Sequence, residues 1–182
     1  MGTLQNIGIF LIDTLFTLYI YAVVIRFILA LSRADFYNDI SQFIVKLTNP
    51  ALVPLRRFVP AMGKIDTATI VLALALVFIK VFLIQVIGGA ELNFVGLFFY
   101  AVIDLIRTII YMYIFALIIQ AVMSWFGNSY GNPLVSILHS ITTPILKPIR
   151  NVVPIIGMID LSVFVAILGL NVLLIIVNGF GV

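Results

Sequence analysis

The chain has 182 residues, of which 64% are hydrophobic and 9% are charged, whereas soluble globular domains are about 45–50% apolar and about 25% charged. This excess of apolar surface excludes a soluble fold and predicts an integral membrane protein. The net charge is +3, and because the chain has no cysteine and one histidine, we expect no disulfide, no metal site, no cofactor and no haem attachment.

Four stretches are long and apolar enough to span a membrane, which needs about 20 mainly apolar residues. In chain order they cover residues 7–31, 67–87, 94–124 and 161–177. The predicted fold class is therefore an all-α membrane protein with four transmembrane helices.

Two shorter amphipathic segments follow the first and third spans, at residues 38–48 and 132–142. Their apolar side chains recur at i, i+3, i+4 and i+7, a spacing typical of a helix lying at the membrane interface. These side chains are Ile40, Phe43, Ile44 and Leu47 in the first segment, and Leu134, Ile137, Leu138 and Ile141 in the second.

The positive charges predict the orientation. Of the ten Lys and Arg residues, seven lie in the two loops that contain the amphipathic segments, and none lies at the termini. By the positive-inside rule both loops are cytoplasmic and both termini are periplasmic. The basic residues are thus explained by topology, and nucleic acid is not an expected partner.

An internal repeat appears when the chain is shifted by 94 residues. The segments TNPALVPLRRFVPAMGKID (48–66) and TTPILKPIRNVVPIIGMID (142–160) are then identical at ten of nineteen positions. Residues 1–90 and 91–182 therefore form two copies of one unit: span, interfacial helix, Pro-rich loop, span. Because each unit has two spans, both copies enter from the same side, and we expect parallel repeats related by an axis along the membrane normal.

The repeated segment is predicted to be a loop, since proline lacks a backbone donor and interrupts helices, and glycine allows a tight turn. The aspartate at its end is placed to cap the next span. The motif residues are Pro50, Pro54, Pro60, Gly63 and Asp66, then Pro144, Pro148, Pro154, Gly157 and Asp160.

Arginines in this motif allow two interpretations. Arg56, Arg57 and Arg150 could bind anionic phospholipid head groups or an acidic partner at the cytoplasmic surface. Alternatively, Arg56 pairs with Asp66, and Arg150 with Asp160, as clamps between loop and helix. We favour the clamps.

Charged residues within the spans form a second candidate site. Arg26 lies near the end of its span and is expected to reach the cytoplasmic surface, but Asp13, Lys80, Asp104 and Arg107 need partners or water. Asp104 and Arg107 are three residues apart and could pair. The cluster could bind an ion or a proton, lock four helices together, or face a partner subunit; we favour the structural role.

The repeated T-x-P-x-L-x-P-x-R-x-x-x-P-x-x-G-x-I-D pattern resembles the YggT (YlmG) family of bacterial and plastid membrane proteins. The segments RADFYN (33–38), SQFIVK and PLRRFVPAMG resemble its proteobacterial members. The second copy departs by having Gln120 and Asn151 where the first has Arg26 and Arg57. The resemblance implies an inner-membrane location, a part in osmotic-stress tolerance and in cell division or envelope organisation, and no catalytic residues.

Two classes of function remain. A non-enzymatic organiser of membrane components, acting with a membrane-protein partner or a second copy, is favoured because four short spans leave little room for a solute path. A small oligomeric channel or transporter, with a polar site between the repeats, is the alternative.

Overall fold

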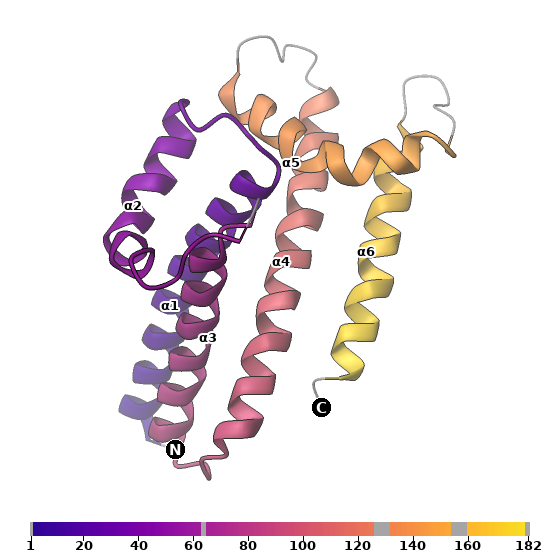
Figure 1. Ribbon diagram of the computed structural model, residues 1–182. Helices are drawn as coiled ribbons and strands as arrows, with labels where there is room; N and C mark the ends of the chain where they lie inside the picture. Colours follow the sequence, from indigo (N-terminus) through magenta and orange to yellow (C-terminus); the bar gives the residue numbers. More distant parts are fainter. Residues whose placement is uncertain (1, 63–64, 126–131, 154–159, 181–182) are drawn as a thin grey trace.

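The computed structural model describes residues 2–62, 65–125, 132–153 and 160–180. This part of the chain contains six helices, α1 (Thr3–Leu31), α2 (Asp39–Leu55), α3 (Thr67–Gly88), α4 (Phe94–Trp125), α5 (Pro133–Arg150) and α6 (Leu161–Gly179). Helices α1, α3, α4 and α6 are long and apolar enough to cross a membrane. They run side by side, and α2 and α5 lie toward the end of the bundle away from the chain termini (Figure 1). The predicted all-α fold with four spans is confirmed.

Helix boundaries follow the sequence repeat. Helix α1 ends at Leu31 and α4 at Trp125, 94 residues later. The starts of α2 and α5, at Asp39 and Pro133, and those of α3 and α6, differ by the same number. Asn38 and Asn132 cap α2 and α5, accepting hydrogen bonds from the backbone N–H groups of Ser41 at 2.8 Å and Leu134 at 2.9 Å. Equivalent residues therefore occupy equivalent helical positions.

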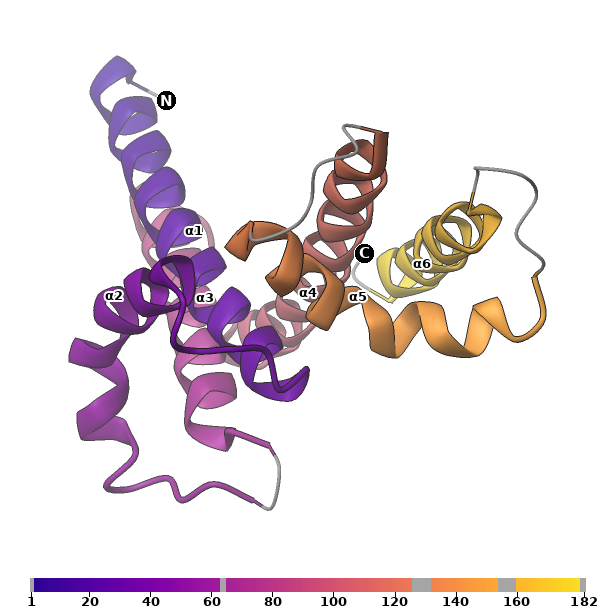
Figure 2. The same cartoon turned by 90° about the horizontal axis from the view of Figure 1, so that it is seen from above.

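The predicted loops begin later than expected. Helix α2 continues through Pro50 and Pro54, and α5 through Pro144 and Pro148, so the interfacial helices are longer than residues 38–48 and 132–142. Each proline removes only one backbone donor, and prolines four residues apart lie on one face, so the helix bends without ending. The axis of α5 changes direction along its length (Figure 2). Among the motif prolines in the described ranges, Pro60 lies beyond α2 and is outside a helix as predicted.

The amphipathic stripes of α2 and α5 pack differently. In α5 three of the four predicted residues, Ile137, Leu138 and Ile141, are buried in the main core cluster. Of the four predicted apolar residues of α2, Ile44 is buried, whereas Ile40, Phe43 and Leu47 are exposed. The α2 stripe is thus free to face lipid, whereas α5 inserts its stripe into the bundle.

Contacts between the repeats are not symmetric. Within each repeat the two spans pack together, α1 with α3 and α4 with α6, and α3 also packs against α4. A closed twofold pair would place α6 against α1, but these two helices make no contact in the described chain. Seen from above, they lie at opposite sides of the molecule (Figure 2). In the described chain the two repeats therefore meet mainly through α3 and α4, in a head-to-tail arrangement.

Candidate functional site

Three of the spans enclose a charged cavity of about 250 Å³. The Lys80 ammonium, on α3, lies 3.6 Å from an Asp13 carboxylate oxygen on α1 and 3.5 Å from an Asp104 carboxylate oxygen on α4. It also lies 3.4 Å from the hydroxyl of Thr17. The Lys80 side chain is 13% exposed and that of Asp13 is 56% exposed, so the cavity opens on the Asp13 side. Its lining residues are Asp13, Thr17, Ile20, Tyr21, Lys80, Asp104, Arg107, Thr108 and Tyr111.

The pairing differs from the sequence prediction. Asp104 pairs with Lys80. Arg107 lines the same cavity but makes no ion pair with Asp104 in the described chain. The Arg107 Nε atom is buried and has no hydrogen-bond partner there. The four predicted residues lie on α1, α3 and α4, so the cluster joins three helices and not four. On α6 the residue equivalent to Lys80 is Leu174. The repeat register instead aligns Asp13 with Arg107, giving opposite charges at one position.

Two carboxylates and two cations make the cavity neutral overall. This composition suits water, or a small ion held between opposite charges, since an isolated charge in the membrane is costly unless paired or hydrated. Within the described ranges, no group of three or more His, Cys, Asp or Glu residues could hold a metal ion.

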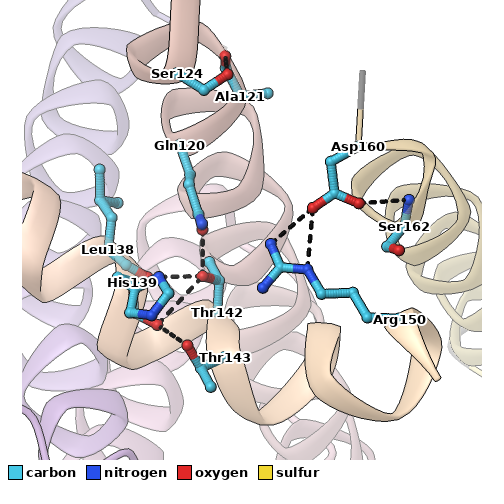
Figure 3. A network of polar contacts seen from close by, with 10 residues as sticks. All are labelled: Gln120, Ala121, Ser124, Leu138, His139, Thr142, Thr143, Arg150, Asp160 and Ser162. Carbon is cyan, nitrogen blue, oxygen red and sulfur yellow. Dashed lines mark hydrogen bonds and ion pairs between the residues drawn. The ribbon is translucent and has the colours of Figure 1, made fainter. Parts of the chain in front are cut away.

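The second loop forms a two-part clamp at the start of α6 (Figure 3). One oxygen of Asp160 accepts from Arg150 Nε at 3.0 Å and from its terminal nitrogen at 2.7 Å. The other oxygen accepts from the backbone N–H of Ser162 at 3.0 Å and caps the helix. Burial raises the pKa of Asp160, but the hydrogen bonds from Arg150 and Ser162 outweigh it and leave that pKa below its usual value.

In the first loop the corresponding ion pair joins Arg56 and Asp66. Here burial also raises the pKa of Asp66, and the hydrogen bond from Arg56 is the main cause that brings it below its usual value. The geometry of a side-chain cap is not met at Asp66, although contacts with Thr69 help to lower the pKa of this carboxyl. The hydroxyl of Thr67 donates instead to the carbonyl of Pro60 at 2.5 Å. Gly63, Pro154 and Gly157 lie outside the described residues.

A third polar contact, absent from the sequence predictions, links each first span to the helix that follows it. Arg26 does not reach the surface: it is 6% exposed and lies 2.6 Å from the hydroxyl of Thr48 and 2.8 Å from the Asn49 side-chain oxygen. Gln120 contacts Thr142 at the equivalent place in the second repeat (Figure 3). The sequence did contain a signal for this contact. Arg26 and Gln120 are polar residues at equivalent positions of two apolar spans, and each is followed by a threonine 22 residues later.

Comparison with known proteins agrees with this architecture. The model of the CCB3/YggT family matches residues 5–87 and 99–180, two segments whose starts are 94 residues apart. No solved structure matches the chain.

Proteins similar to most of this chain occur in several bacteria. The chain is 42% identical to an uncharacterized protein encoded in the proC 3′ region of Vibrio alginolyticus, over 89% of this chain and 88% of the relative. It is 37% identical to an uncharacterized protein of Pseudomonas aeruginosa, over 93% and 87%. It is 35% identical to the uncharacterized protein YggT of Escherichia coli, over 93% and 88%. The twofold match of the family model and these relatives together show that the chain belongs to the CCB3/YggT family.

Proposed function

We propose that this protein is a non-enzymatic organiser of the bacterial inner membrane that assists other membrane components. In this role it contributes to osmotic-stress tolerance or to envelope and division homeostasis. Both termini are periplasmic in the proposed orientation, and the two motif loops face the cytoplasm.

The charged residues of the repeated motif support this proposal, because they form ion pairs within the protein. Arg56 and Arg150 are each joined to the motif aspartate of their own loop, ten residues away. Their guanidinium groups hold the loop against the start of the following span, where a helix terminus leaves backbone groups unsatisfied. In the proposed orientation the repeated motif thus ties each interfacial helix to the following span at the cytoplasmic edge, a property that suits a scaffold.

The same edge offers contacts for lipid head groups or a membrane-protein partner. Arg57 is exposed and belongs to no ion pair within the described ranges. The next residue, Phe58, is 82% exposed, and its repeat equivalent Val152 is 83% exposed. An arginine beside an exposed apolar side chain suits the boundary of an anionic membrane, where the ring enters the interface and the cation meets phosphate.

A small oligomeric channel or transporter is the second candidate, favoured by one observation. The charged cavity lies among the spans, and the exposed carboxylate of Asp13 connects Lys80 with its open side. A transport role would require protons or ions to bind there and leave on the other side.

Complementation of a bacterial strain that lacks the gene separates the two candidates. The test variant, Lys80→Met/Asp104→Leu, removes one charge of each sign and leaves Asp13 and Arg107 in balance. If the protein is an organiser, this variant, once shown to be inserted at the wild-type level, restores growth after hyperosmotic shock. Failure of the well-inserted variant would favour transport. A deletion strain with normal growth, shape and division would reject both osmotic and division roles.

A further inference from the structure

Helix α6 lacks the neighbour that its equivalent α3 has. The side of α3 that meets α1 and α4 includes Ala73, which lines a cavity among these helices, and Val77 one turn further along; both are buried. The equivalent residues of α6 are Ile167 and Asn171, and Asn171 is exposed. Because the repeats pack head to tail, the α3–α4 interface occurs once inside the chain and leaves one unused helix side at each end, on α6 and on α1.

A polar group marks the unused side of α6. Asn171 lies about 12 Å from the end of α6, near the middle of a hydrocarbon layer about 30 Å thick. Its amide nitrogen donates to the carbonyl of Ile167 at 2.8 Å, which leaves the second N–H and the amide oxygen facing lipid. Unpaired amide groups in hydrocarbon are costly, and asparagine joins membrane helices by hydrogen bonds across their interface.

The matching surface is on α1. The α4 residues that face α3 include Leu105 and Thr108, both buried, and their equivalents on α1 are Leu11 and Thr14. Leu11 is exposed and Thr14 is partly exposed. Exposed apolar side chains continue this stripe on both sides of Thr14, namely Ile7 and Leu18.

The register of the α3–α4 interface predicts the register of an equivalent interface between α6 and α1 of another copy. On α3 and α4, which run in opposite directions, Lys80 is level with Asp104, 3.5 Å away. Shifted by the repeat, this pair corresponds to Leu174 on α6 and Phe10 on α1. Asn171 lies about one turn from Leu174, and Thr14 about one turn from Phe10, both toward the cytoplasmic side. Asn171 and Thr14 are therefore level with each other. Two polar side chains thus occupy the same depth on two otherwise apolar stripes.

We propose that α6 of one chain packs against α1 of a second copy, as α3 packs against α4, with the Asn171 amide donating to the hydroxyl of Thr14. The contact is heterologous, so successive copies close into a ring or extend as a chain. A central polar pair also fixes the register of the two helices, because any shift leaves both groups unpaired. The second copy is favoured over lipid because it alone supplies a hydroxyl at this depth.

Cysteine cross-linking tests the interface directly, because the chain has no cysteine of its own. Leu74 of α3 and Ile109 of α4 line one cavity, which α1 also borders, so their equivalents Leu168 and Leu15 should meet across the new interface. Chains carrying Leu15→Cys and Leu168→Cys are co-expressed and oxidised in native membranes. We expect a disulfide-linked dimer only when both chains are present. A chain carrying both changes should give a ladder of oligomers.

The matched control is Leu173→Cys, an exposed position about 140° around α6 from Leu168, which should cross-link poorly with Leu15→Cys. Dimers formed by Leu168→Cys alone would show that α6 pairs with α6 and would overturn the proposal. A yield no higher than that of the control would overturn it in favour of lipid.

The polar pair is tested in the same background. Asn171→Leu should lower the association constant about threefold, the usual size of one interhelical hydrogen bond in a membrane. Thr14→Val should do the same, and the two changes together should cost little more than either alone. An unchanged yield in correctly inserted Asn171→Leu protein would reject the hydrogen bond. These measurements do not depend on osmotic tolerance, so their failure leaves the proposed organiser role standing.

Discussion

The buried guanidinium of Arg26 donates to the hydroxyl of Thr48, 2.6 Å away, and that hydroxyl lies 2.7 Å from the carbonyl of Ile44. One threonine therefore connects a cation in α1 to the backbone of α2. In the second repeat Gln120 contacts Thr142, whose hydroxyl lies 2.8 Å from the carbonyl of Leu138. Both repeats thus use one threonine to fix the following helix against the first span.

Because the second repeat uses glutamine, Arg26→Gln should keep most of the stability of the first repeat. Arg26→Leu should lose about 1.5–3 kcal/mol, the usual contribution of hydrogen bonds made by a charged group. Unfolding of the purified protein by SDS in mixed micelles measures both changes. Equal stability of the two variants would show that this contact is not stabilising.

The charged cavity should behave as a structural ion-pair cluster. Lys80→Met leaves two carboxylates without their shared cation and should cost about 3 kcal/mol, the lower end of the range for buried pairs, because Asp13 is half exposed. Adding Asp104→Leu should recover at least half of that loss. The exposed Lys147→Met is the control and should change stability by less than about 0.5 kcal/mol. A double variant less stable than Lys80→Met would contradict this interpretation.

The two loop clamps differ in one hydrogen bond, so their variants should differ as well. Asparagine at position 160 keeps the cap on Ser162 and loses the ion pair, whereas alanine loses both. Asp160→Ala should therefore be about 1 kcal/mol less stable than Asp160→Asn. Asp66 makes no cap, so Asp66→Ala and Asp66→Asn should be nearly equal. A cap-sized difference at Asp66 would mean that its carboxylate also caps α3.

Acid should weaken both clamps. The pKa values of Asp66 and Asp160 are lower in the folded protein than in the unfolded chain, where aspartate has a pKa of about 3.9. Their contribution to stability is therefore complete above that value and is lost as the pH falls through the folded pKa. The free energy of unfolding should therefore fall as the pH drops below about 4. This loss of stability should be smaller in the double variant Asp66→Asn/Asp160→Asn. An equal loss in that variant would show that other titrating groups cause it.

Topology is tested by labelling from one side of intact cells. Phe58→Cys lies in a motif loop and Glu91→Cys in the connection between α3 and α4, and both native side chains are exposed. We expect an impermeant maleimide to label Glu91→Cys from the periplasm, and Phe58→Cys only after permeabilisation. Gly89 is a poorer site because its φ of +69° disfavours a side chain. Labelling of both from the same side would reject the four-span topology.

Periodicity, composition and the 94-residue repeat were sufficient to predict the all-α fold and the extent of the spans. The first span was predicted over residues 7–31 and α1 covers Thr3–Leu31. This was possible because a membrane requires each span to satisfy its backbone internally over a length fixed by the bilayer. The family was identified from the same repeated motif.

Tertiary contacts decided how the polar residues are used. The motif prolines were expected to interrupt the helix at position 48, but α2 runs to Leu55. The backbone N–H groups that the prolines lack are offset by contacts that the spacing of residues does not reveal. Spacing allowed Asp104 to pair with Arg107 within its own helix, but Lys80 on a neighbouring helix lies 3.5 Å away. Sequence fixes which residues share a helix face, whereas the partner across a helix interface depends on packing and register between helices. The charged cavity and the buried Arg26 therefore follow only from the packed structure.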